Sequence, residues 1–192
     1  MSSTPQHVLD LACGQHKVAG AIGLDLAAVP GVDVVADIER GALPFRSDTF
    51  ETVHASHVIE HVQSIPQLMR EIHRVARAGA RVHIATPHYS WHASWVDPTH
   101  RWHLSVRTFS YFAEEHFSAY YTGARYRVVA LQLSMPRLWR RLGIEYLLNL
   151  ENRHRAFRFA RKFWEEYLAF VVRGKEMRAV LEVIKPAAAG PR

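Results

Sequence analysis

Short apolar runs, each accompanied by an aspartate, open the sequence. Apolar runs of this length, bounded by turn residues, are typical of strands buried in a parallel sheet. The pattern therefore predicts three strands with a carboxylate at or near the end of each. The runs and their aspartates are residues 6–11 with Asp10, residues 21–26 with Asp25, and residues 32–36 with Asp37.

The next part of the chain alternates between helix and strand patterns. Ser64 and Gln67 form a capping-box signature, and apolar residues follow at helical spacing up to Gly79. This pattern predicts an amphipathic helix that covers one face of the sheet. Further strands are expected over residues 51–55, 81–86, 126–134 and 177–184.

A helical pattern also fills residues 137–173, between the last two expected strands, and a short helix is expected over residues 110–116. One face of the inserted helices is charged, with Arg161 and Glu165, and Lys162 and Glu166, four residues apart. The opposite face is apolar and is expected to be buried. That face consists of Phe157, Ala160, Trp164, Tyr167, Leu168 and Val171.

A turn of small residues around Gly14 follows the first strand. Such a turn lets the backbone approach a ligand at the carboxyl end of a parallel strand. The dinucleotide fingerprint of hydride-transferring enzymes needs three glycines at set spacing, and only Gly14 is present. Too few residues separate the first two strands for an ordinary crossover helix, so we expect a helical stub or an irregular loop there.

Five motifs follow one another in the first half of the chain. They are Val-Leu-Asp-Leu-Ala-Cys-Gly from Val8 to Gly14, Leu43-Pro44-Phe45, Phe50-Glu51-Thr52-Val53, Glu60-His61-Val62, and Arg74-Val75 with Gly79. Together they resemble the class I S-adenosylmethionine-dependent methyltransferases of the small-molecule type, whose first loop reads Leu-Asp-Leu-Gly-Cys-Gly. The resemblance covers Val8 to about Pro87, and Ala12 and His16 stand where the family has glycine.

The resemblance implies an α/β fold with a doubly wound, Rossmann-like sheet of seven strands. The sheet is mostly parallel, and its last strand runs antiparallel between the fifth and the sixth. A chain of 192 residues suits one domain, here residues 1–192. The inserted helices of residues 137–173 are expected to form a lid over the site or a dimer element.

S-adenosyl-L-methionine is the cofactor that the resemblance implies. Asp25 is expected to accept both ribose hydroxyls, because a carboxylate at the end of the second strand offers two acceptors. Asp37 is assigned to the adenine amino group and Ile38 to the adenine face. Lys17 is assigned to the methionyl carboxylate, although an exposed loop charge explains it equally well. The other expected cofactor contacts are Asp10, Ala12, Cys13, Gly14, Leu26, Ser56 and His57.

The loop from His88 to Arg107 is rich in histidine and tryptophan, which indicates a substrate site. Aromatic side chains supply apolar walls, and an arginine pairs with a carboxylate or phosphate. A tightly packed structural loop is the alternative. The histidine spacings in this loop match no closed metal motif, so we expect no metal. The predicted substrate-binding residues are His88, Trp91, His92, Asp97 and Arg101.

A general base is needed only if the methyl acceptor is largely protonated near neutral pH. Histidine suits this role because its ordinary pKa leaves it mostly neutral in that range. We prefer His100, whose ring Asp97 can orient, and keep His57 as the second candidate.

Charge divides the chain into two parts. The net charge is +6 overall, but residues 1–136 carry −1 and residues 137–192 carry +7. A basic region suits nucleic acid, an anionic surface or an acidic substrate, although a solvated helix face is commoner. The single cysteine fits a reducing compartment, and no apolar run approaches the roughly 20 residues that cross a bilayer. We therefore expect a cytoplasmic protein without a membrane span.

These observations predict a methyltransferase that acts on an oxygen, nitrogen or carbon atom of a small molecule, with homodimerisation allowed and no nucleic acid partner. Two alternatives stay open. The basic C-terminal part favours an RNA methyltransferase, and the altered first loop favours a non-catalytic protein that binds the cofactor or a partner.

Overall fold

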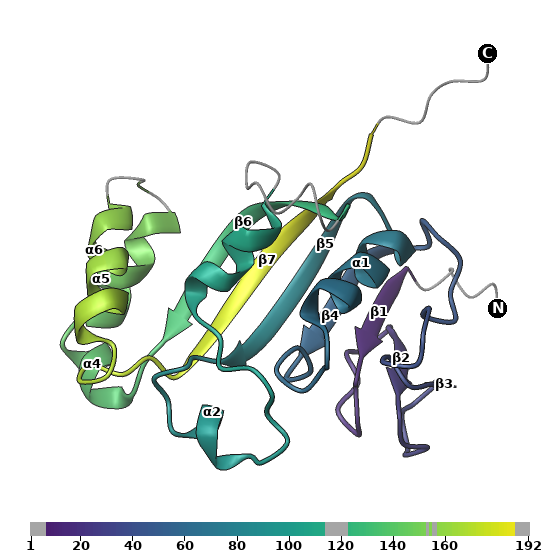
Figure 1. Ribbon diagram of the computed structural model, residues 1–192, viewed down its shortest axis with the longest axis horizontal. Helices are drawn as coiled ribbons and strands as arrows, with labels where there is room; N and C mark the ends of the chain where they lie inside the picture. The colour runs from purple at the N-terminus through teal and green to yellow at the C-terminus, as the bar shows by residue number, and fades with distance from the viewer. Residues whose placement is uncertain (1–6, 114–122, 153, 155–156, 187–192) are drawn as a thin grey trace.

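The computed structural model describes residues 7–113, 123–152, 154 and 157–186 of the chain. It contains a sheet of seven strands in the order β3-β2-β1-β4-β5-β7-β6 (Figure 1). The first five strands pair in parallel, and β7 runs antiparallel to both β5 and β6. The expected seven-stranded α/β fold is thus confirmed. The strands are β1 (Val8–Leu11), β2 (Ile22–Asp25), β3 (Val34–Val35), β4 (Phe50–Ser56), β5 (Ala76–Pro87), β6 (Arg125–Ser134) and β7 (Glu176–Ile184).

Helix α1 (Ile65–Val75) covers one face of this sheet. The Ser64 side chain accepts a hydrogen bond from the backbone N–H of Gln67, as the capping signature predicts. The Tyr126 hydroxyl of β6 donates to the carbonyl of Met69, at 2.6 Å, which ties the helix to the far side of the sheet. The helix buries Ile65, Leu68, Met69, Ile72 and Val75.

Two boundaries differ from the sequence expectation. Strand β5 begins at Ala76, directly after α1, because Ala76 pairs with Phe50 of β4. The short helix expected over residues 110–116 is the 3₁₀ helix η1 (Val106–Phe112), while residues 114–116 lie outside the described part of the chain. Helix α2 (Ala93–Val96) is a single turn in the loop after β5.

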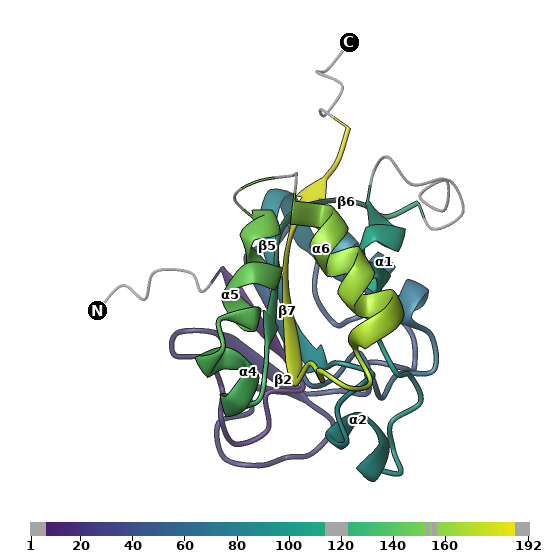
Figure 2. The same cartoon turned by 90° about the vertical axis from the view of Figure 1, so that its left-hand side faces the viewer.

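The connection from β1 to β2 is an irregular loop, as expected, and no helix lies in the described residues between β1 and β4. On the side of the sheet opposite α1, the described helices α4 and α5 lie at the β6 end (Figure 2), and none comes from the connections between β1 and β4 to cover the central strands. The side chains on this face are polar and partly exposed, and His54 and His83 stack there with ring centroids 4.9 Å apart. Helices therefore cover this face less completely than expected for a doubly wound sheet, in which both faces are covered.

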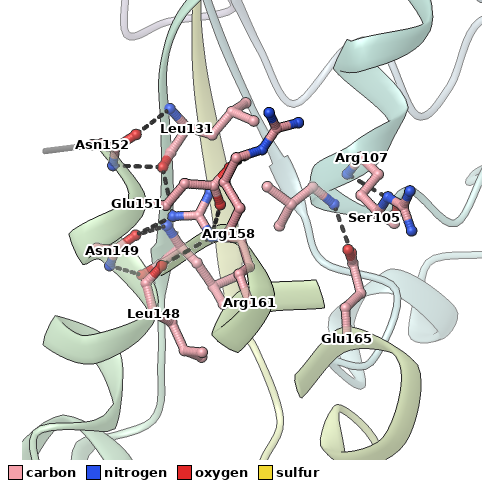
Figure 3. A network of polar contacts seen from close by, with 12 residues as sticks. Ser105, Arg107, Leu131, Leu148, Asn149, Glu151, Asn152, Arg158, Arg161 and Glu165 are labelled. Carbon is pink, nitrogen blue, oxygen red and sulfur yellow. Dashed lines mark hydrogen bonds and ion pairs between the residues drawn. The ribbon is translucent and has the colours of Figure 1, made fainter. Parts of the chain in front are cut away.

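The inserted helices lie along the free edge of β6. Helix α5 (Ile144–Asn149) and the 3₁₀ turn η2 (Leu150–Asn152) present two asparagines to this edge (Figure 3). Asn149 accepts from the N–H of Leu133 at 2.9 Å and donates to its carbonyl at 2.8 Å. Asn152 does the same at Leu131, at 3.0 and 2.8 Å. The side-chain amides therefore replace the next strand, which satisfies a backbone edge that would otherwise remain unpaired.

The expected burial of the inserted helices is wrong in part. In α6 (Arg158–Phe163) and the π-helix η4 (Trp164–Leu168), Arg161 and Glu165 are only 3% and 8% exposed. Tyr167 and Val171, expected inside, are 69% and 73% exposed. The reason is the β6 edge: Arg161 donates to the carbonyls of Leu148 and Leu131, so a charged side chain faces inward.

The insertion lies at the opposite edge of the sheet from β1 and β2 (Figure 1). Helix α4 (Arg137–Arg141) precedes α5, and Leu148 and Trp164 join the main hydrophobic core. The role of the inserted helices as a lid or a dimer element stays a prediction. Among the described residues, no helix is both long enough and apolar enough to pass through a bilayer.

Candidate functional site

The carboxyl ends of the parallel strands meet at one edge of the sheet. Ser134 of β6 and Glu176 of β7 pair at the same edge, next to Pro87 of β5. In open α/β sheets, ligands bind beyond this edge. The sequence-predicted residues that follow β1, β2 and β4 are therefore brought to one side of the molecule.

Asp10 and Asp25 hold the loop after β1. Asp10 accepts from the N–H of Val18 at 2.8 Å, and Asp25 accepts from the N–H of Gly14 at 2.9 Å. The second Asp25 oxygen accepts from Ala27 at 3.0 Å. Asp10 is buried, so its part is to shape the loop, whereas the partly exposed Asp25 carboxylate keeps lone pairs for further donors.

The same loop is strained at Ala12, whose φ of 52° lies in the left-handed region. A residue other than glycine is disfavoured in this region, because its Cβ crowds the backbone. Gly14 has a φ of 50°, and a Cβ added to it would meet no atom within 4 Å. Cys13 donates its N–H to the carbonyl of Leu24, which fixes the loop against β2. The open space beside Gly14 is where a ligand can approach the backbone.

Lys17 does not stand free at this loop. Its Nζ donates to Asp33 at 2.7 Å, and the same Asp33 oxygen accepts from the N–H of Gly23. These hydrogen bonds, that of Lys17 first, lower the pKa of Asp33. The Lys17 stem packs on Gly23, where an added Cβ would lie 2.6 Å from its Cδ. This placement favours the alternative of a structural charge, and Asp33 is a partner that the sequence reading missed.

Three other expected cofactor residues lie after β2 and β3. Asp37 accepts from the N–H of Glu39 at 2.9 Å and pairs with Arg40 at 3.2 Å. Ile38 packs against the hydrophobic core, whereas Leu26 is 70% exposed. Their contacts with a bound cofactor stay predictions.

His57, directly after Ser56 at the end of β4, lies between two carboxylates. Its Nε2 is 3.3 Å from Glu176, and its Nδ1 is 3.3 Å from Glu60. The close contact with Glu176, followed by that with Glu60, raises the pKa of His57 to about 9. His57 also has a φ of 53°, a strained conformation that is often found at functional sites. The sequence reading saw no acidic neighbour, because Glu176 is far away in the chain.

A pKa of about 9 favours the charged form of His57 near neutral pH. This value disfavours the sequence-based hypothesis that His57 is the base, and the catalytic role of His57 stays a prediction. Ser56 is exposed beside it, at the end of the same strand. In its charged form, His57 supplies a positive charge that compensates Glu60 and Glu176.

The loop after β5 divides into buried and exposed residues. His88 is fully buried and contacts Ser90 at 2.8 Å and Glu165 at 3.4 Å. This position indicates a structural role rather than the predicted contact with substrate. Trp91 is half-buried, with its ring 4.5 Å from that of His92. The side chains of His92, Asp97 and Arg101 are exposed and stay predicted substrate contacts.

His100 approaches the segment after β4. Its Nδ1 lies 3.0 Å from the carbonyl of Ser94, so this nitrogen carries the proton and Nε2 has a free lone pair. Asp97, expected to orient the ring, lies 3.9 Å from Nε2 and is held instead by Thr99. The ring of His61 packs against that of His100, with centroids 4.6 Å apart.

Two adjoining cavities open along the uncovered face at this edge. One, of about 550 Å³, lies beside His57, and the other, of about 640 Å³, reaches Tyr146 and Lys175. Both are lined by Gln132, Glu176 and Arg178, so they adjoin, and each has the size of a small-molecule site; together they are called the hollow below.

The family model described as a methyltransferase domain matches residues 2–131. The chain belongs to the methyltransferase domain family. A comparison of this sequence with curated proteins finds no match. The activity of the chain is S-adenosylmethionine-dependent methyl transfer, as the sequence resemblance implies.

Solved structures show the same fold. An S-adenosylmethionine-dependent methyltransferase from Archaeoglobus fulgidus aligns with a TM-score of 0.58 and 16% identity, over 92% of this chain and 85% of that one. One from Mesorhizobium loti aligns at 0.54 and 16%, over 93% and 91%. Phosphoethanolamine N-methyltransferase 2 from Haemonchus contortus, bound to S-adenosyl-L-methionine, aligns at 0.55 and 15%, over 97% and 50%.

The residues at the carboxyl edge fit this cofactor. The partly exposed carboxylate of Asp25 suits a pair of ribose hydroxyls, and the backbone at Gly14 is open to a ligand. The cofactor, when bound, supplies an electrophilic methyl group on a sulfonium.

Proposed function

We propose that the methyltransferase acts on a small molecule held in the hollow beside His57. The observation that carries this proposal is the position of the hollow, which begins at His57 and Ser56 at the carboxyl end of β4. In the sheet, β4 lies next to β1, whose loop is the expected cofactor site. A methyl acceptor in this hollow is therefore beside the cofactor loop, as an in-line displacement requires.

The residues of the hollow can position a polar acceptor. Gln132 and Arg178 carry hydrogen-bond donors, and Gln132 and Glu176 carry acceptors, so a molecule with both donors and acceptors is matched. His100 is the predicted base for an acceptor that must lose a proton, since its Nε2 has a free lone pair while the charged form of His57 is favoured. Val180 and Ile84 supply an apolar wall that shields a bound acceptor from water.

RNA is a weaker candidate acceptor. Several basic side chains of the C-terminal part pair with acidic ones: Arg158 and Arg161 with Glu151, and Lys185 with Asp48. These pairs leave fewer free cations for phosphates, and the pair with Asp48 also offsets one charge of the net +7 with an acid from the first part of the chain.

The cofactor assignment is tested first by calorimetry with S-adenosylmethionine and S-adenosylhomocysteine. Asp25→Ala should weaken binding by about 2 to 3 kcal/mol, because two ribose hydroxyls lose a charged acceptor. Glu51→Ala is the matched control, since Glu51 is an exposed acid at the start of β4 that pairs with Arg77. An unchanged dissociation constant in folded Asp25→Ala contradicts the ribose assignment.

The acceptor class is tested by release of S-adenosylhomocysteine in the presence of small amines, phenols, hydroxy acids and a pool of structured RNA. Turnover with a small molecule supports the proposal. Turnover only with RNA, falling steeply with salt, favours the RNA methyltransferase. Cofactor binding without turnover on any acceptor favours the non-catalytic alternative.

A further inference from the structure

Three potential metal ligands converge beside the proposed acceptor site. Glu60 and His61 follow β4, and His100 comes from the loop after β5. One ligand atom from each lies within 4.8 Å of the others. The backbone fixes this approach, because the N–H groups of Arg101 and Trp102 donate to the carbonyl of Glu60, at 2.8 and 3.2 Å.

Glu60 is a buried carboxylate without adequate partners. Its side chain is 1% exposed, and neither oxygen has an aligned hydrogen-bond donor among the described residues. His57 lies at an ion-pair distance from Oε1 only. Burial of a carboxylate is costly unless it is paired or bound to a metal. His57 compensates the charge of Glu60 from the Oε1 side, and Oε2 is available to a further cation.

Both histidines are oriented as metal ligands are. His100 donates from Nδ1 to the carbonyl of Ser94 at 3.0 Å. His61 Nδ1 lies 2.9 Å from Thr99 Oγ1, whose own proton goes to Asp97 at 2.6 Å. Thr99 therefore accepts from His61. In each ring the Nδ1–H is occupied and the Nε2 lone pair is left free, which is the usual arrangement around a metal-bound imidazole.

We propose that Glu60, His61 and His100 bind one divalent transition-metal ion. Two imidazoles and a carboxylate suit Zn²⁺, Mn²⁺, Fe²⁺ or Co²⁺ better than Mg²⁺ or Ca²⁺, which prefer oxygen ligands. Three protein ligands leave open positions for water or a substrate atom. The sequence expectation of no metal considered only the spacings of the loop histidines, whereas this set joins that loop to residues 60 and 61.

The metal role in the reaction rests on the proposed function. An acceptor hydroxyl that binds the ion has a lowered pKa and releases its proton to solvent. The oxygen then forms the new C–O bond as the C–S bond of the sulfonium breaks, and neutral S-adenosylhomocysteine leaves. His100 is then a metal ligand and not the general base.

Metal binding is tested without any acceptor. Chelator-treated protein is titrated with Co²⁺, followed by visible absorption, and with Zn²⁺, followed by calorimetry. One ion should bind per chain, and His61→Gln or His100→Gln should weaken binding at least about tenfold. Glu60→Gln tests the third ligand. Thr99→Val keeps all three ligands but removes the hydrogen bonds of Thr99 Oγ1 to His61 and Asp97, and it should weaken binding by about tenfold.

His92→Ala is the matched control, because His92 is an exposed histidine of the same loop outside the cluster. Circular dichroism and cofactor affinity show whether each variant is folded. No binding by the wild type, or the same affinity in all ligand variants, overturns the site. Metal binding with full turnover after chelation keeps the site and removes its role in catalysis. Metal binding with no turnover on any acceptor counts against the proposed function alone.

Discussion

Two buried glutamates, Glu60 and Glu165, each lie beside a histidine but in different surroundings. Glu165 accepts from the N–H of Val106 at 3.0 Å and lies 3.4 Å from a fully buried His88. Glu60 has no aligned donor, and its neighbour His57 has a side chain that is 52% exposed. Glu165 lies where the inserted helices pack against the rest of the fold, whereas Glu60 lies beside the hollow at the carboxyl ends of the parallel strands.

The difference shows how a structural polar pair is distinguished from a functional one. Glu165 connects η4 to Val106, the first residue of η1, and has an aligned donor on one oxygen and none, among the described residues, on the other. Glu60 has no aligned donor among the described residues on either oxygen, and it lies close to a strained residue and two histidines. Unsatisfied polarity and strain at one place are expected where a ligand completes the structure.

The largest expected effect on turnover comes from substitution of His100, which lies close to Glu60. His100→Asn should reduce turnover by roughly 10² to 10⁴-fold, because it removes a base or a metal ligand, and should leave cofactor affinity nearly unchanged. Steady-state kinetics with the identified acceptor measure this. A variant with the wild-type rate and pH profile would make His100 structural, as we infer for His88.

Unfolding in urea compares the two acids directly. Glu165→Ala should destabilise the protein by about 3 kcal/mol, since it leaves the N–H of Val106 without its acceptor and leaves Glu151 as the one remaining acid, among the described residues, beside the buried charge of Arg161. Glu60→Ala, measured in metal-free protein, should cost about 1 kcal/mol or less, because that carboxylate loses only its ion pair with the half-exposed His57. Equal losses in the two variants would remove the distinction.

The third effect is a pH dependence on the Glu60 side. The carboxylates of Glu176 and Glu60 raise the pKa of His57 from its ordinary 6.5 to about 9. The stabilisation is therefore complete below about pH 6.5 and is lost as the pH rises through about 9. Urea midpoints between these values should fall with pH in the wild type and much less in His57→Gln. His92→Gln should follow the wild type, and a flat wild-type profile contradicts the pairing.

The smallest effect is expected at Ala12, the strained residue after β1. Ala12→Gly should raise the free energy of unfolding by at most about 1 kcal/mol, because relief of the left-handed strain is offset by the greater entropy of glycine in the unfolded chain. Thermal unfolding measures it. A loss of stability would mean that the methyl group of Ala12 packs favourably in the loop.

Much of the fold could be predicted because local patterns agree with tertiary structure in the first half. The apolar runs ending at Asp10 and Asp25 are strands, and Ser64 caps the helix that the spacing indicates. The insertion is different: periodicity placed Tyr167 inside and Arg161 outside, and the structure reverses both. A helical pattern predicts which face is apolar, but it does not show that the backbone of an edge strand needs polar side chains as hydrogen-bond partners.

The sequence by itself determined the family, the cofactor, and the strands whose ends carry the cofactor loop, because these depend on contiguous residues. Only the tertiary structure decided that Lys17 is held by Asp33, that His57 lies between Glu60 and Glu176, which raise its pKa, and that His100 meets His61. Protonation and ligation depend on distances of a few ångströms between groups far apart in the chain, and these distances exist only once the sheet brings its strand ends together.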